Sequence, residues 1–437
     1  MESLFLMIAK YVITFLMAMY AFSCFNVFRY KTEYARRYIY FRQNIYMLLI
    51  YTIAFVVLLI KTMDIRYFYF YLVSMFSLVV IITIYKVVYK RSNRLIVNNM
   101  CMLLSVGFII LARLSFYKAT RQYAIAMISV VLTGLIPFII SKGPFFSKLK
   151  WVYVIVGLSS LLGVLVFSSR TFGAKINISI MGVTFQPSEF VKIIFIFAMA
   201  SFLSEATDFK HILITTAIAA AHVVILVLSK DLGGAVILFV VYLCMLYVAT
   251  CNILYCGIGL VAGAFGAVVG YKLFSHVRVR VQAFLDPIGT ISNAGYQISQ
   301  SLFAIGTGGF FGMGLKEGAP EKIPVVAADF VFSAISEELG GFFSMCLILI
   351  CMSCFVMFMN ISMRFENRFY KFVALGLGIL YGFQVLLTIG GVTKFIPLTG
   401  VTLPLISYGG TSVLVTMVMF SIIQGLYIGR GNDSLYQ

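Results

Sequence analysis

The sequence predicts an all-α protein, a polytopic membrane helical bundle of about 13 transmembrane helices. Of its 437 residues, 62% are hydrophobic and only 11% are charged, whereas soluble domains are about 45 to 50% apolar. The apolar residues fall in repeated stretches of about 18 to 25, each long enough to cross a hydrocarbon core roughly 30 Å thick. Continuous runs of that length favour helices over a β-barrel.

The predicted spans follow one another with short connections, except for one long loop at 276–331 that we expect to contain short interfacial helices. The span that ends at Arg113 is the shortest. The expected limits are 5–27, 43–62, 66–88, 98–113, 121–140, 151–169, 187–204, 210–229, 231–250, 253–275, 332–359, 370–392 and 402–428.

The orientation follows from Lys and Arg, which stay on the cytoplasmic side in short loops. Four alternate loops collect these residues, at 29–42, 86–94, 142–150 and 364–371. With 13 spans this places the N-terminus outside, the C-terminus inside and the 276–331 loop on the outer face. Basic residues at 113–121 fall on the predicted outer side, so a missed or extra span before residue 121 is the alternative.

The formal net charge of +18 is spread over these loops. It therefore indicates a membrane surface with anionic headgroups and no nucleic-acid partner. The eight cysteines lie almost entirely inside predicted spans, where Cys packs as a small apolar residue. The three histidines are isolated from one another and from cysteine clusters, so the sequence predicts no zinc site.

Three carboxylates stand where the eleventh span begins: Asp329, Glu337 and Glu338. An ionised side chain in hydrocarbon costs roughly 2.5 to 3.5 kcal/mol on insertion scales, so each needs a partner, water or a function. Before them, residues 295–305 form an amphipathic stretch too short to span, typical of an interfacial helix. The glycines at 306–314 allow tight turns and close approach of a ligand.

Five sequence blocks follow one another in the second part of the chain: Gln186-Pro-Ser-Glu189 with Lys192, Asp231-Leu-Gly-Gly, Gly295-Tyr-Gln-Ile-Ser-Gln-Ser301, Asp329-Phe-Val-Phe with Glu337-Glu-Leu-Gly340, and Leu403-Pro-Leu-Ile-Ser-Tyr-Gly-Gly-Thr-Ser412. In this order they resemble the SEDS family of RodA, FtsW and SpoVE. The similarity covers 97–430; residues 1–96 would be three additional N-terminal transmembrane helices and residues 431–437 a cytoplasmic tail.

The resemblance implies a peptidoglycan glycosyltransferase that polymerises lipid II at the outer face of the bacterial cytoplasmic membrane. It also implies a class B penicillin-binding protein and other cell-wall synthesis proteins as partners, in elongation, division or sporulation. Two positions differ from the family's usual pattern. Ile176-Asn177 replaces an Arg-Trp pair, and Ala327-Ala328 replaces a polar pair.

By the same resemblance Asp329 is the catalytic residue, and it suits the base that takes a proton from the attacking sugar hydroxyl. The alternative is an N-cap of the following helix. Arg278 and Arg280 point the same way if their stretch is extended and, with Lys175, are candidates to bind the pyrophosphate, or to contact lipid headgroups. A divalent cation, Mg²⁺ or Mn²⁺, is the other group that would stabilise the leaving charge; no cofactor is required by the sequence.

The other candidate substrate-binding residues each have a structural alternative. Glu189 and Lys192 suit an intrahelical ion pair, Asp231 suits an N-cap, and Glu337 and Glu338 suit a buried pair that pins neighbouring helices. The full set is Lys230, Glu189, Lys192, Gln297, Gln300, Glu337, Glu338, Ser407 and Tyr408. Two other function classes stay open. One is a lipid II flippase, for which we detect no internal repeat; the other is a non-catalytic scaffold.

Overall fold

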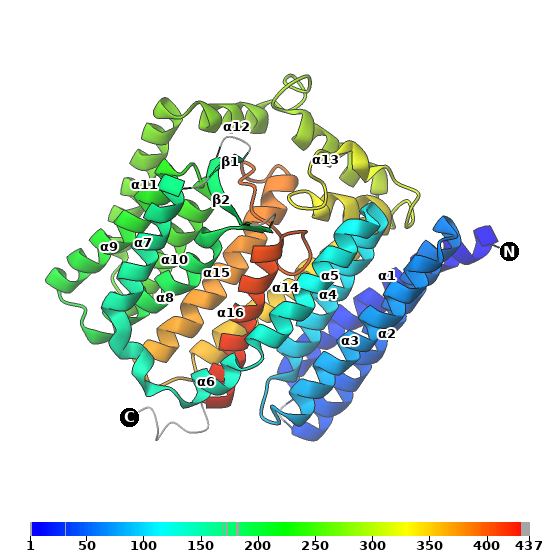
Figure 1. The fold of residues 1–437 in the computed structure, drawn as a ribbon, viewed down its shortest axis with the longest axis horizontal. Helices are drawn as coiled ribbons and strands as arrows, with labels where there is room; N and C mark the ends of the chain where they lie inside the picture. The colour runs from blue at the N-terminus through cyan, green and yellow to red at the C-terminus, as the bar shows by residue number, and fades with distance from the viewer. Residues whose placement is uncertain (1, 31, 168, 172–173, 181–182, 430–437) are drawn as a thin grey trace.

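The computed structural model describes residues 2–30, 32–167, 169–171, 174–180 and 183–429. Within them, 13 helices are long and apolar enough to cross a membrane, which confirms the predicted multi-pass bundle (Figure 1). The long helices are α1 Glu2–Arg29, α2 Glu33–Thr62, α3 Ile65–Val87, α4 Arg94–Leu114, α5 Phe116–Thr133, α7 Lys150–Phe167, α8 Pro187–Glu205, α9 Phe209–Leu228, α10 Leu232–Thr250, α11 Ile253–Leu273, α14 Val331–Ser362, α15 Arg368–Val392 and α16 Gly410–Gly429.

Shorter elements connect these spans. α6 Ile136–Lys142 continues the span that α5 begins, and the 3₁₀ turn η1 Pro144–Leu149 leads into α7. The long loop between α11 and α14 contains α12 Ser275–Leu285, α13 Tyr296–Gly308 and the 3₁₀ turn η2 Pro320–Lys322, so the predicted short helices are present. Figure 1 shows α12 and α13 at one end of the bundle and α6 at the other.

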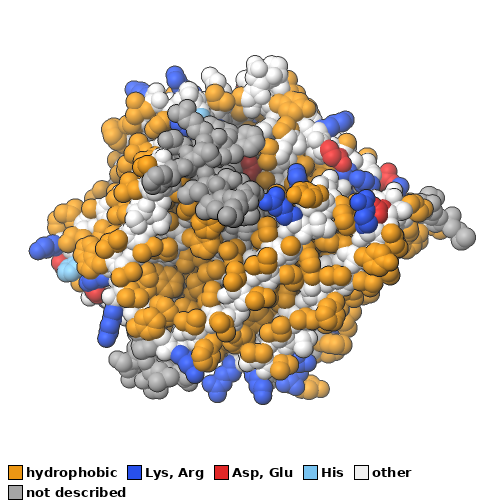
Figure 2. Space-filling model, in the orientation of Figure 1, with side chains coloured by type: hydrophobic (Ala, Val, Ile, Leu, Met, Phe, Trp, Pro, Cys, Tyr) orange, Lys and Arg blue, Asp and Glu red, His pale blue; other side chains and the backbone are white. Residues whose placement is uncertain are grey.

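The core of the bundle is α4, whose spanning window is wholly buried. It packs against α2, α3, α5 and α14, while α8, α10 and α15 form a second buried group. By contrast α11 buries none of its residues and lies at the edge of the bundle. Hydrophobic side chains cover the middle of the face in Figure 2, and Lys and Arg gather along its lower edge. This is the pattern of a protein surrounded by hydrocarbon with a basic rim.

Two expectations are wrong in detail. The last span does not begin at residue 402, because residues 402–409 form a non-helical segment and α16 begins at Gly410. The segment instead bonds to the loop before α14: Tyr408 N–H donates to the Ala327 carbonyl at 2.8 Å. The three antiparallel strands β1 Ser169–Thr171, β2 Ala174–Ile180 and β3 Val183–Phe185 were also not expected.

Helix α14 is broken at Gly340, where φ is 92° and ψ is 164°. The break frees the carbonyls of Glu337 and Glu338 from the helix ladder. They accept hydrogen bonds from Met313 N–H at 2.8 Å and Gly314 N–H at 2.9 Å. The glycine-rich loop therefore pairs backbone to backbone with α14, and Gly312 admits this close approach. The expected approach of a ligand to the other glycines stays a prediction.

Replacing Gly312 with alanine is expected to destabilise this junction by about 1 to 3 kcal/mol. Its φ is 79°, and an added Cβ would lie 2.2 Å from the Glu338 carbonyl oxygen. Gly306→Ala is the matched control, because a Cβ there meets open space in α13 and improves helix propensity. Chemical unfolding in detergent measures both. Equal stability of the two variants would contradict the proposed close approach.

The three helices before residue 94 pack directly against the rest of the bundle. Tyr20 O–H donates to Asn99 Oδ1 at 3.1 Å, and Lys10 Nζ donates to the Gly312 carbonyl at 3.0 Å. α1 therefore contacts both α4 and the glycine-rich loop. The assignment of residues 1–96 as an additional unit stays a prediction, as does its role.

Candidate active site

Asp329 lies in the loop immediately before α14, at the same end of the bundle as α12 and α13. Its N–H donates to the carbonyl of Val325, a residue in the left-handed region with φ of 58°. The N-cap of α14 is Phe330, with no side-chain cap. The helix-capping alternative for Asp329 is therefore wrong, and no described side chain donates a hydrogen bond to this carboxylate.

Arg280 is the cation that faces Asp329. A Cβ built on Gly400 would lie 3.7 Å from Asp329 Oδ2 and 3.9 Å from Arg280 Nη2, so both groups border the same glycine. Arg280 Nη1 donates to the Thr399 carbonyl at 3.1 Å, which fixes the guanidinium. Burial raises the pKa of the Asp329 carboxyl, and the positive charge of Arg280 opposes that rise.

The pairing of Arg278 with Arg280 is wrong, because residues 275–285 form helix α12 and not an extended segment. Side chains two apart on a helix point in different directions. Arg278 is exposed, whereas Arg280 is partly buried against the 399–400 segment. Only Arg280 joins the Asp329 site.

Asp231 brings the start of α10 to this site. Its Oδ1 accepts from Gly234 N–H at 2.9 Å, so the predicted N-cap is present. Its charge acts on Arg280 together with that of Asp329. A Cβ on Gly233 would approach the Thr399 carbonyl oxygen to 3.2 Å, which shows how closely α10 meets the segment that holds Arg280.

The start of α8 is tied to the same cluster through Ser188, whose hydroxyl donates to Asp231 Oδ2 at 3.1 Å. Lys192 Nζ lies 2.7 Å from Glu189 Oε1, confirming the predicted ion pair, and Lys192 is buried. Pro187 occupies the first helical position, where its missing N–H costs nothing. Glu189 and Lys192 therefore lie within about one helix turn of Ser188, the α8 residue that bonds Asp231.

The chain matches the FtsW, RodA and SpoVE family, described as cell cycle protein, over residues 93–428. The chain belongs to this family. In this chain the match begins at residue 93, just before α4, and leaves α1–α3 outside.

Curated relatives carry the three family names. A peptidoglycan glycosyltransferase RodA of Mycobacterium tuberculosis is 37% identical over 271 residues, which is 58% of this chain and 58% of that protein. The chain therefore matches less than two thirds of the length of that relative. Stage V sporulation protein E of Bacillus subtilis is 31% identical over 323 residues, covering 71% of this chain and 86% of that protein.

Solved structures share the fold. A chain from a peptidoglycan synthase complex, studied for how polymerisation and crosslinking are coordinated, aligns with a TM-score of 0.67 and 22% identity, covering 78% of this chain and 99% of that one. The rod shape determining protein RodA of Thermus thermophilus aligns with a TM-score of 0.60 and 22% identity, covering 78% and 97%. At this identity the likeness concerns architecture.

Glu337 and Glu338 hold the loop that precedes α14 against that helix. Glu337 Oε1 accepts from Ala319 N–H at 2.9 Å. Glu338 is fully buried and forms an ion pair with Arg113, which also pairs with Glu321 and donates to the Gly318 carbonyl at 2.9 Å. These contacts favour the pinning alternative over direct contact with substrate.

Arg113 is the residue whose role the sequence analysis missed. The sequence places it as an outer-side charge that conflicts with the topology, but it is buried in α4 and paired with Glu338. The other two basic residues of that stretch, Lys118 and Arg121, lie within α5, and the described residues before 121 contain no extra span. The signal was available, because an Arg and a Glu that both stand within membrane spans each need a partner of opposite charge.

Ser407 and Tyr408 position the loop that carries Asp329. The Ser407 hydroxyl donates to the Ala328 carbonyl at 2.5 Å and is buried, so it is not free for a sugar. Tyr408 is partly exposed, with its ring 6.0 Å from Lys118 Nζ. Because the bonds to residues 327 and 328 use backbone carbonyls, the alanines there preserve this contact.

The remaining candidates are less closely tied to Asp329. Gln297 and Gln300 are partly buried on α13, and their side chains form no hydrogen bond with a described residue. Lys230 is exposed beside Asp231, with φ of 64°. Lys175 lies in β2, but its side chain is outside the described residues, as are those of Ile176 and Asn177. Their roles stay predictions.

Proposed function

We propose that this chain is a peptidoglycan glycosyltransferase that polymerises lipid II at the outer face of the bacterial cytoplasmic membrane. The proposal rests on the Asp329 carboxylate. It is partly buried, does not cap α14, and faces Arg280 across Gly400. Family membership and the names of the curated relatives support the same activity. The N-terminus outside and the C-terminus inside follow from the basic rim opposite this site.

In the proposed reaction, a sugar hydroxyl of one lipid-linked disaccharide attacks the anomeric carbon of another. The hydroxyl proton passes to Asp329, a new C–O bond forms, and the C–O bond to the polyprenyl diphosphate breaks with inversion. A raised pKa brings the carboxylate nearer to the working pH and strengthens it as a proton acceptor. The positive charge of Arg280 favours the ionised form.

The diphosphate leaving group needs positive charge. Arg280 has donors beyond the one used on Thr399. Exposed Arg278 stands on the same helix, and exposed Lys230 stands just before α10. No group of three metal-ligating side chains occurs among the described residues. Asp329 and Asp231 both face the Arg280 guanidinium, so these residues do not fit a resident divalent cation.

A class B penicillin-binding protein, with other cell-wall synthesis proteins, is the proposed partner. The resemblance supports this partner, as does the fold shared with a chain from a complex that coordinates polymerisation and crosslinking. A variant that lacks α1–α3 tests whether those helices bind the partner, by measuring how much partner copurifies with it from membranes. Unchanged copurification would count against that role.

The direct test gives purified protein lipid II, alone and with a penicillin-binding partner, and sizes the products. Glycan chains that disappear with Asp329→Ala support the polymerase. Movement of lipid II across vesicles without chain formation would favour a flippase instead. Neither activity, with partner binding retained, would favour a scaffold.

Arg280→Gln is expected to move the acid limb of the rate profile to higher pH. Removing the positive charge lets burial raise the pKa of Asp329 further, so a smaller fraction of the base is ionised at a given acidic pH. The loss in kcat/KM should therefore be larger at pH 6 than at pH 8, as measured by lipid II consumption.

Two controls separate this effect from loss of phosphate contacts. Arg278→Gln removes an exposed cation from the same helix and is expected to leave the acid limb in place even where the rate falls. Lys272→Gln, the second control, removes an exposed cation from α11 and should also leave the acid limb in place. A pH profile of Arg280→Gln parallel to the wild type would remove Arg280 from the role assigned here.

A further inference from the structure

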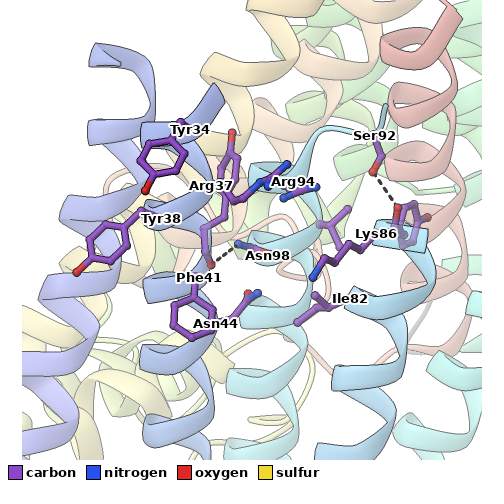
Figure 3. A pocket seen from close by; sticks show the side chains of 13 residues that line it. Tyr34, Arg37, Tyr38, Phe41, Asn44, Ile82, Lys86, Ser92, Arg94 and Asn98 are labelled. Atoms are coloured by element: carbon purple, nitrogen blue, oxygen red, sulfur yellow. Dashed lines mark hydrogen bonds between the residues drawn. The ribbon is translucent and has the colours of Figure 1, made fainter. Parts of the chain in front are cut away.

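A pocket of about 510 Å³ lies between the start of α2, the end of α3 and the start of α4 (Figure 3). It stands outside the Asp329 site. A neighbouring pocket, which shares Tyr40 with it, is lined by Asn360 and Arg364 at the far end of α14 from Asp329. Because α14 has 32 residues, the two sites are separated by roughly the thickness of the bilayer.

Three cations from three different helices line this pocket: Arg37 from α2, Lys86 from α3 and Arg94 at the start of α4. Figure 3 shows their side chains reaching toward the same space. None of them is paired with a carboxylate among the described side chains. Among the described side chains that line the pocket there is no Asp or Glu either. Converging positive charges without a counter-ion attract an anion.

Aromatic and apolar side chains also line the pocket, which suits an anion that carries an apolar tail. Tyr38 is 64% exposed and Phe41 is 62% exposed on the α2 wall, and Ile82 lines the α3 wall. Aromatic side chains beside basic ones mark the headgroup level of a bilayer. Asn44 Oδ1 is buried at the pocket without a described partner, and a headgroup hydroxyl would satisfy it.

We propose that this pocket binds the headgroup of an anionic phospholipid from the adjacent leaflet. Arg37, Lys86 and Arg94 contact the phosphodiester, and the acyl chains lie along Phe41 and Ile82. Two of the three helices precede the family match, which begins at residue 93, so the site belongs mainly to the N-terminal helices. A bound lipid would join α2 and α3 to α4 at the basic rim.

The test uses the full chain, extracted in neutral detergent and analysed by native mass spectrometry with phosphatidylglycerol or phosphatidylcholine added. The wild type is expected to retain one phosphatidylglycerol at least tenfold more often than phosphatidylcholine. The triple variant Arg37→Gln, Lys86→Gln and Arg94→Gln should lose that preference at least tenfold. Asn44→Leu, which removes the buried polar group and keeps every charge, should weaken retention by a smaller factor.

The matched control is the triple variant Arg29→Gln, Lys90→Gln and Arg91→Gln, which removes the same charge from exposed positions on the same rim outside the pocket. It should retain phosphatidylglycerol like the wild type. Equal loss in both triple variants would overturn the site in favour of general attraction to the rim. Displacement of the lipid by millimolar inorganic phosphate would overturn the lipid assignment and indicate a free-anion site. Elution of all variants as a single monodisperse peak checks that they fold.

Discussion

Replacing Asp329 with asparagine is expected to slow glycan polymerisation by about 10²- to 10⁴-fold, the usual contribution of a positioned base. Asparagine keeps the shape of the side chain and removes its ability to take a proton. The Asp329 carboxylate accepts no hydrogen bond from a described side chain and is not a helix cap, so little structure depends on it. Single-turnover assays with lipid II measure the rate directly.

The same variant should be as stable as the wild type or more stable. Burial raises the pKa of Asp329, so the stability that this group contributes is present at low pH and lost as the pH rises through its folded-state pKa. At neutral pH, removing the charge therefore costs the fold nothing. Asp208→Asn, at an exposed residue between α8 and α9, is the activity control. Loss of activity together with loss of folding would contradict a catalytic role.

Arg113→Ala is expected to lower the free energy of unfolding by about 3 to 5 kcal/mol, the usual cost of breaking a buried ion pair. It would leave the Glu338 carboxylate buried without its partner and release Glu321 and the Gly318 carbonyl. The 312–321 segment should then become sensitive to limited proteolysis. Activity should fall with it, because this loop leads into the segment that carries Asp329.

A double variant decides whether charge or packing is at stake. Arg113→Met combined with Glu338→Leu removes both buried charges and should recover most of the lost stability. Lys61→Ala breaks the more exposed pair with Glu317 in the same region, and should cost no more than about 1 kcal/mol. If the double variant were as unstable as Arg113→Ala, the ion pair would not be the source of the effect.

The physics of the bilayer made most of the fold readable from the sequence. Every spanning backbone group must be bonded within its own segment, so apolar length alone located 13 helices. Local rules also identified the Asp231 cap and the ion pair between Glu189 and Lys192, because both lie within one helix. The amphipathic pattern likewise located α13.

Contacts between distant segments could not be derived in this way. The extended reading of residues 278–280 failed because the same residues form a helix, α12, that turns only Arg280 toward Asp329. The last span was placed too early because residues 402–409 exchange helix bonds for bonds to the loop at 327–328. The deciding bonds join residues far apart in the chain: Arg280 and Thr399 are 119 positions apart, and Ser407 and Ala328 are 79 positions apart.

The sequence by itself determined that this protein crosses a membrane many times, which end is basic, and where carboxylates stand at unusual depth. Only the tertiary structure decided which charges meet: Arg113 forms an ion pair with Glu338, and Arg280 faces Asp329 across Gly400. The physical reason is range. Hydrophobic burial depends on the composition of each segment, whereas a charge is stabilised by the one group that the folded chain brings within a few ångströms.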